Sequence, residues 1–125
     1  MLSVRNFIIL SGLGGFISVA FGAFGAHFLK TRLDEYYLSV FKTGVEYQFF
    51  HSLALGFVAL TLERWQSPLL RFSGAFFIVG MVIFSGSLYL LAMTKIKMWG
   101  AVTPLGGLCF LVGWALFVVA AVKQS

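Results

Sequence analysis

The sequence predicts an all-α integral membrane protein, a four-helix bundle in which residues 1–125 form a single four-span transmembrane domain. The chain is 60% hydrophobic and only 10% charged, which is far from the composition of a soluble domain. Its uncharged side chains are gathered in four long runs, at 7–28, 47–62, 72–94 and 98–122. A helix of about 20 apolar residues crosses the ~30 Å hydrocarbon core of a bilayer, so each run predicts one crossing.

The first run predicts a transmembrane helix over residues 6–28. It is longer than the roughly 7–15 apolar residues of a secretory signal peptide, so we expect it to stay in the mature chain, with cleavage as the alternative. Small side chains recur along it at intervals of three and four, which aligns them on one face and lets another backbone approach closely. We expect this face to pack against another helix, in this chain or in a neighbour, through Gly15, Ser18, Gly22 and Gly25.

The second run predicts a transmembrane helix over residues 45–62, with Glu46 at the membrane boundary. The segment 30–43 before it mixes charged and aromatic residues, and apolar positions such as Tyr37 and Phe41 fall at helical spacing. This pattern predicts a short interfacial amphipathic helix that lies on the membrane surface between the first and second spans. A solvated loop is the alternative.

The last two runs predict helices over 72–94 and 103–122. Small residues repeat in both with a seven-residue step, which places Gly80 on one face of the third helix and Gly106 and Gly113 on one face of the fourth. Glycine on a shared face allows tight contact between membrane helices. We therefore expect these glycines to pack against neighbouring helices.

The start of the fourth helix is predicted from Thr103 and Pro104. Threonine at the N-cap followed by proline at the first helical position is a common helix start, because that position needs no backbone N–H. Residues 95–102 then form a short interfacial connection, with Trp99 as an anchor at headgroup level.

The charged residues lie singly in the connections and flank the spans. Such charges anchor helices against lipid headgroups, so the net charge of +5 predicts contact with the lipid bilayer and no nucleic-acid partner. Lysines and arginines are divided four against five between the two faces, which leaves the orientation open. An even number of crossings places both termini on one side. The small-residue faces could serve a second copy of this chain or another membrane protein.

Polar side chains within the spans gather toward one membrane face. In an antiparallel bundle, the ends of the first and third helices meet the starts of the second and fourth. We predict a polar vestibule or binding site there, made by His27, Glu46, Tyr47, Gln48, His51, Ser85, Ser87, Tyr89 and Thr103. Two interpretations stay open: a proton-sensitive entrance to a conduit, or hydrogen-bonded contacts that fix the register of the helices, with Glu46 paired to Lys42 one turn earlier on the surface.

The sequence offers no recognisable catalytic or metal-binding pattern. Its two histidines and single cysteine, Cys109, lack the spacing of zinc motifs, and no serine lies in a nucleophile elbow. We expect no enzymatic activity, no metal and no cofactor.

Four motifs, in order along the chain, carry a family resemblance. They are GAFGAH at 22–27, TGVEYQ at 43–48 followed by His51, FSGSLY at 84–89, and TPLGG at 103–107 followed by Gly113 and Trp114. With these the chain resembles the YgdD/YwdK family of small bacterial inner-membrane proteins, the domain-of-unknown-function 423 family, which has mitochondrial relatives in animals. The resemblance implies a multi-pass protein of the bacterial inner (plasma) membrane and brings no activity.

The expected function is therefore that of an integral inner-membrane protein of unknown biochemical activity. A structural or accessory role, as a scaffold or assembly factor, is the favoured interpretation, because the polar positions do not continue through the apolar half of the bundle. The alternative is a small-solute or proton conduit with a polar vestibule at one membrane face.

Overall fold

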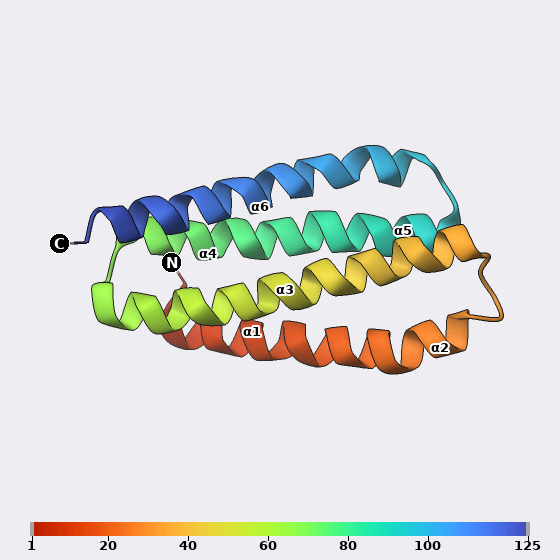
Figure 1. Ribbon diagram of the computed structural model, residues 1–125, viewed down its shortest axis with the longest axis horizontal. Coiled ribbons are helices and arrows are strands. Elements are labelled where there is room, and N and C mark those ends of the chain that lie inside the picture. The colour runs from red at the N-terminus through yellow and green to blue at the C-terminus, as the bar shows by residue number, and fades with distance from the viewer. Residues whose placement is uncertain (1, 125) are drawn as a thin grey trace.

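The computed structural model describes residues 2–124, and these residues are all-helical, without any β-strand. Four continuous helical segments are long and apolar enough to span a membrane, which confirms the predicted fold class (Figure 1). The first comprises α1 (Val4–Val19), a π-helical segment η1 (Ala20–Gly25) and α2 (Ala26–Leu29); the second is α3 (Glu35–Trp65); the third comprises α4 (Pro68–Gly80), η2 (Met81–Ser85) and α5 (Gly86–Thr94); the fourth is α6 (Met98–Val122).

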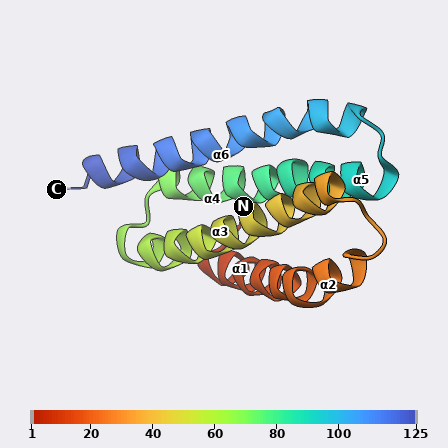
Figure 2. The same ribbon diagram turned by 45° about the vertical axis from the view of Figure 1, so that its right-hand side comes forward.

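The four spans lie side by side in the order α1, α3, α4–α5, α6, and both views show α1 and α6 at opposite edges (Figures 1 and 2). α1 packs mainly on α3, α6 packs mainly on α4 and η2, and α3 also contacts α4 and α5. α3 is the most buried span and α1 the least buried. The bundle is therefore open on its sides, where grooves between neighbouring helices face the lipid.

Two apolar clusters form the core, one toward each end of the bundle. The cluster near the chain termini includes Phe7, Leu55 and Phe77, which are at most 1% exposed. The cluster at the other end includes Phe41 and Ala92. The hydrogen bonds between helices join the same pairs of neighbouring helices that pack in these two clusters.

The predicted amphipathic surface helix is wrong, because residues 35–43 form the beginning of α3. Asp34 caps this helix by accepting a hydrogen bond from the backbone N–H of Tyr37 at 3.0 Å, and the helix then continues without interruption to Trp65. The apolar positions of the segment pack on protein rather than on lipid headgroups. Val40 and Phe41 are buried in the same cluster as Leu29 and Leu88.

The predicted start of the fourth helix is also wrong. α6 begins at Met98, so Trp99 lies in its first turn and Pro104 lies inside it. Thr103 is not an N-cap: its hydroxyl donates to the carbonyl of Trp99 at 3.2 Å, one turn earlier. Proline is tolerated within membrane helices because neighbouring helices and hydroxyl side chains satisfy the backbone groups around it.

Candidate functional site

The polar residues at the centre of α3 point to two different neighbours. Successive residues of a helix are about 100° apart, so Tyr47 and His51 share one face while Gln48 and Ser52 share the next. Tyr47 and His51 face a groove toward α6, and Gln48 faces a groove between α1 and the third span. The helix thus separates the expected vestibule into two clusters.

Both ring nitrogens of His51 are occupied by hydrogen bonds within the protein. Nδ1 lies 2.8 Å from the carbonyl oxygen of Tyr47, and Nε2 lies 3.1 Å from the indole nitrogen of Trp114 on α6. A carbonyl can only accept and an indole N–H can only donate. His51 is therefore neutral in this arrangement, with its proton on Nδ1 and with Nε2 as the acceptor.

Aromatic rings enclose the His51 imidazole. It stacks on Phe110 with ring centroids 3.5 Å apart, and its edge meets Phe77 at 5.4 Å. On the outer side lies a groove of about 610 Å³ whose walls include Tyr47, Pro104 and Trp114. The groove is largely apolar, so it presents rings and hydrocarbon rather than hydrogen-bonding groups to an occupant.

Gln48 joins three spans through its side-chain amide. Its Nε2 donates to the carbonyl of Gly14 in α1 at 3.0 Å, and its Oε1 accepts from the hydroxyl of Tyr89 in α5 at 2.7 Å. Ser18 donates to the same Gly14 carbonyl at 2.8 Å. The Ser11 hydroxyl adds another α1–α3 bond, to the carbonyl of Ser52 at 2.7 Å.

Hydroxyl groups make the remaining cross-helix bonds. Ser85 donates to the carbonyl of Gly44 at 2.7 Å, and the hydroxyls of Ser87 and Thr103 lie 2.6 Å apart between the third and fourth spans. Nearer the termini, Ser73 donates to the carbonyl of Gly113 at 2.7 Å. Among residues 2–124, every buried side-chain nitrogen or oxygen has a hydrogen-bond partner.

The nine residues predicted to form one vestibule are not brought together. His27 lies exposed at the end of α2, and Glu46 lies exposed on the outer face of α3. Tyr47 and His51 line one groove, whereas Gln48 and Tyr89 line another. Ser85, Ser87 and Thr103 are buried between helices. Within the described residues, no group of three His, Cys, Asp or Glu side chains could hold a metal ion.

The glycines predicted for helix packing differ in their surroundings. A Cβ added at Gly80 or Gly113 would lie within 2.7 Å of a phenylalanine ring, and one at Gly106 would meet the backbone of Phe84. Gly22 and Gly25 lie against side chains of α3, and Ser18 is buried. Gly15 lies against no other helix of this chain, because a Cβ there would meet nothing within 4 Å, so of the two expected contacts only one with a neighbouring molecule is left for it.

The close contacts of two further glycines, Gly14 and Gly44, were not predicted from the sequence. A Cβ at Gly14 would collide with the Ser52 hydroxyl, and one at Gly44 would lie 2.8 Å from the Tyr89 ring. Gly14 stands four residues before Ser18, the spacing of one helix face, but Gly15 offered a second register three residues before it. The sequence pattern alone did not separate the two.

Comparison with known proteins finds a family of unknown function and relatives that are named as membrane proteins. A family model described as "Protein of unknown function (DUF423)" matches residues 21–107. The UPF0382 inner membrane protein YgdD of Escherichia coli (strain K12) is 43% identical over 122 residues, which cover 98% of this chain and 93% of that protein. The UPF0382 membrane protein YwdK of Bacillus subtilis (strain 168) is 43% identical over 121 residues, with 96% and 98% covered. No solved structure matches the chain significantly.

Proposed function

Because the chain belongs to the DUF423 family and is a multi-pass inner-membrane protein of unknown activity, we propose that it has a structural or accessory role in the membrane, as a scaffold or assembly factor. The lipid bilayer surrounds it on all sides of the bundle. Its further partner is a second copy or another membrane protein. No catalytic step is assigned to it.

The observation that carries this proposal is the complete pairing of the buried polar side chains. Each buried hydroxyl, amide and imidazole described above is used in a hydrogen bond, and most of these bonds join two spans. An unsatisfied polar group in hydrocarbon is costly, so such bonds favour one helix register. Polar groups committed to one another in this way support a structural role.

The pairing of His51 argues against a proton relay through this residue. A relay would need Nε2 to take up a proton, but the Trp114 indole N–H points at that nitrogen. Protonation there requires the bond between α3 and α6 to break. A small-solute or proton conduit with a polar vestibule at one membrane face is the competing proposal.

The pairing of polar groups also supports the absence of enzymatic activity. A nucleophilic serine needs a base within hydrogen-bond reach of its hydroxyl. The hydroxyls of Ser85 and Ser87 instead donate to backbone carbonyls or share a bond with Thr103. Neither is hydrogen-bonded to His51.

Proton flux through liposomes tests the proposed function. We expect purified protein, reconstituted in liposomes under an imposed pH gradient, to leave the proton leak equal to that of protein-free liposomes. Glu46→Gln and His51→Ala should give the same leak, with Lys97→Gln in the exposed connection before α6 as the control. A protein-dependent flux that either Glu46→Gln or His51→Ala abolishes would overturn the proposal in favour of a conduit.

A further inference from the structure

From the end of the bundle where His27 lies, the charged residues of α3 extend further along the spans than the charged residues of the neighbouring spans do. A Cβ at Gly22 would lie 3.2 Å from Val45, and the Ser85 hydroxyl bonds to the carbonyl of Gly44. These two contacts place Glu46 level with Gly22 on the first span and with Ser85 on the third. The depth of Glu46 can therefore be read from the ends of these neighbours.

Well beyond this level neither neighbour carries a lysine, an arginine or a carboxylate, and the first span has one histidine, His27. The first span continues six residues from Gly22 to Phe28, and the third continues nine residues from Ser85 to Thr94. At ~1.5 Å per residue these distances are about 9 and 13 Å. Phe24 and Phe28 are 75% and 59% exposed, as expected of side chains that face lipid. Glu46 thus lies about 9–13 Å inside the ends of the apolar segments beside it, deeper than the membrane boundary predicted for it from the sequence.

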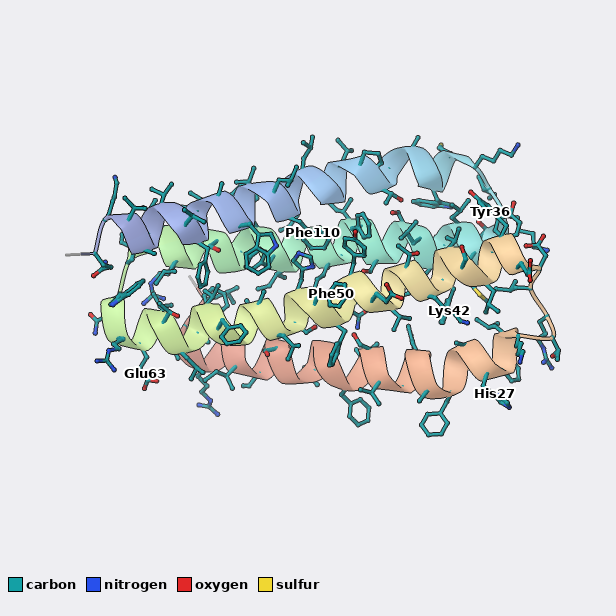
Figure 3. All side chains as sticks on the ribbon, viewed as in Figure 1. His27, Tyr36, Lys42, Phe50, Glu63 and Phe110 are labelled. Carbon is teal, nitrogen blue, oxygen red and sulfur yellow. The ribbon has the colours of Figure 1, made fainter. Side chains whose placement is uncertain are left out.

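Glu46 is the innermost member of an exposed polar face on α3. We define this polar face as Glu35, Ser39, Lys42 and Glu46, whose spacing of four, three and four places them on one side of the helix. All four side chains are exposed. Figure 3 shows Tyr36, Lys42, Phe50 and Glu63 in this order along α3, with Tyr36 at the end of the bundle where His27 of α2 lies. After Glu46 along the chain, the exposed side of α3 becomes apolar, at Phe49, Phe50 and Leu53.

An ionised side chain that faces hydrocarbon is costly, so such residues normally meet protein or water and have a partner. Two hollows lie along the polar face of α3. One of about 620 Å³ is lined by Glu35, Ser39 and Lys42, and one of about 250 Å³ lies beside Glu46. The face therefore carries charge at a depth where a partner in addition to Lys42, one turn before Glu46 on the same helix, is stabilising, and it has open space beside it for a partner's side chains.

We propose that the polar face of α3 is a self-association surface and that its occupant is the same face of a second copy. Two copies with the same membrane orientation bring their α3 helices together in parallel. In such a pair, a side chain reaches the partner residue about one turn along, as the flanking charges of parallel coiled coils do. Lys42 of each copy then pairs with Glu46 of the other, so the surface is self-complementary under a two-fold axis.

A phospholipid headgroup fits this face less well. The phosphate is the deepest charge of a phospholipid headgroup, and the deepest charge of the polar face is the carboxylate of Glu46. A lipid in register with Lys42 would therefore place like charges close to Glu46, which is unfavourable at low dielectric. Association of two copies instead brings opposite charges together at both positions.

Charge exchange in a bilayer tests this surface. We expect fluorescence energy transfer between labelled copies in vesicles to reveal a dimer of the wild-type protein. Glu46→Lys or Lys42→Glu should weaken its association constant at least about 10-fold, because each leaves like charges facing one another. The double variant Lys42→Glu/Glu46→Lys should restore the constant to within about 3-fold of wild type, since the pairs are re-formed with exchanged signs. Lys97→Glu, in the exposed connection before α6, is the matched control.

Cross-linking gives an independent readout if a charge variant fails to fold. Ser39→Cys in a Cys109→Ser background should form a disulfide between copies in the membrane, because position 39 lies on the polar face of α3. A monomeric wild type at all protein-to-lipid ratios would overturn the proposal. Unchanged association of the single variants, or a double variant as weak as the singles, would do the same, as would charge variants that alter lipid retention but not self-association.

Discussion

Replacing Gly106 with alanine should lower the free energy of unfolding by about 1–3 kcal/mol, whereas the same change at Gly107 should leave it unchanged or slightly raised. A Cβ at Gly106 would lie 2.7 Å from Cα and Cβ of Phe84 and would also meet its backbone nitrogen, within η2. The contact is between two backbones, so no side chain can rotate to relieve it. A Cβ at Gly107 meets nothing within 4 Å.

Reversible unfolding of both variants in the same detergent mixture measures this difference. The two substitutions change helix propensity by the same amount, so Gly107→Ala controls for the loss of backbone freedom. Equal stabilities of the two variants would show that α6 and η2 do not approach closely at Gly106 and Phe84.

Replacing Gln48 with methionine should cost about 1–2 kcal/mol of unfolding free energy. The substitution keeps the length of the side chain but removes the amide that joins Gly14 and Tyr89, leaving the tyrosine hydroxyl without its acceptor. Tyr89→Phe removes the other partner of the same bond. We expect the double variant to be less destabilised than the sum of the two single variants.

A double-mutant cycle measured by unfolding tests the bond between Gln48 and Tyr89. The expected coupling free energy is about 0.5–1.5 kcal/mol, the range of hydrogen bonds between membrane helices. Strictly additive effects would contradict a bond that joins α3 and α5.

The fold class followed from the sequence because membrane thickness imposes one strong requirement, a long uncharged helix for each crossing. The uncharged runs made the four spans predictable. The N-terminal third of α3 was not, because its polar residues recur at the spacing that a surface helix also shows. Only the burial of Val40 and Phe41 against other spans distinguishes the two arrangements.

The polar residues were predicted more accurately as a set than as a site. Their position toward one membrane face followed from the antiparallel order of the helices. Which neighbour each one meets depends on the rotation of α3, and a rotation of one residue exchanges Tyr47 for Gln48. The same uncertainty explains why Gly15 was expected in a close contact that Gly14 makes. The π-helical segments at 20–25 and 81–85 had no sequence signal that we recognised.

The position of the proton on the His51 imidazole is the measurement that tests most directly whether the polar side chains within the spans join helices or relay protons. We expect nitrogen NMR of the histidine-labelled protein in bilayers to show a single neutral form of His51, with the proton on Nδ1 and with Nε2 accepting from Trp114. His27→Gln removes the other imidazole signal and makes the assignment unambiguous. A substantial population with a proton on Nε2, or of the imidazolium, would contradict the structural role of this residue.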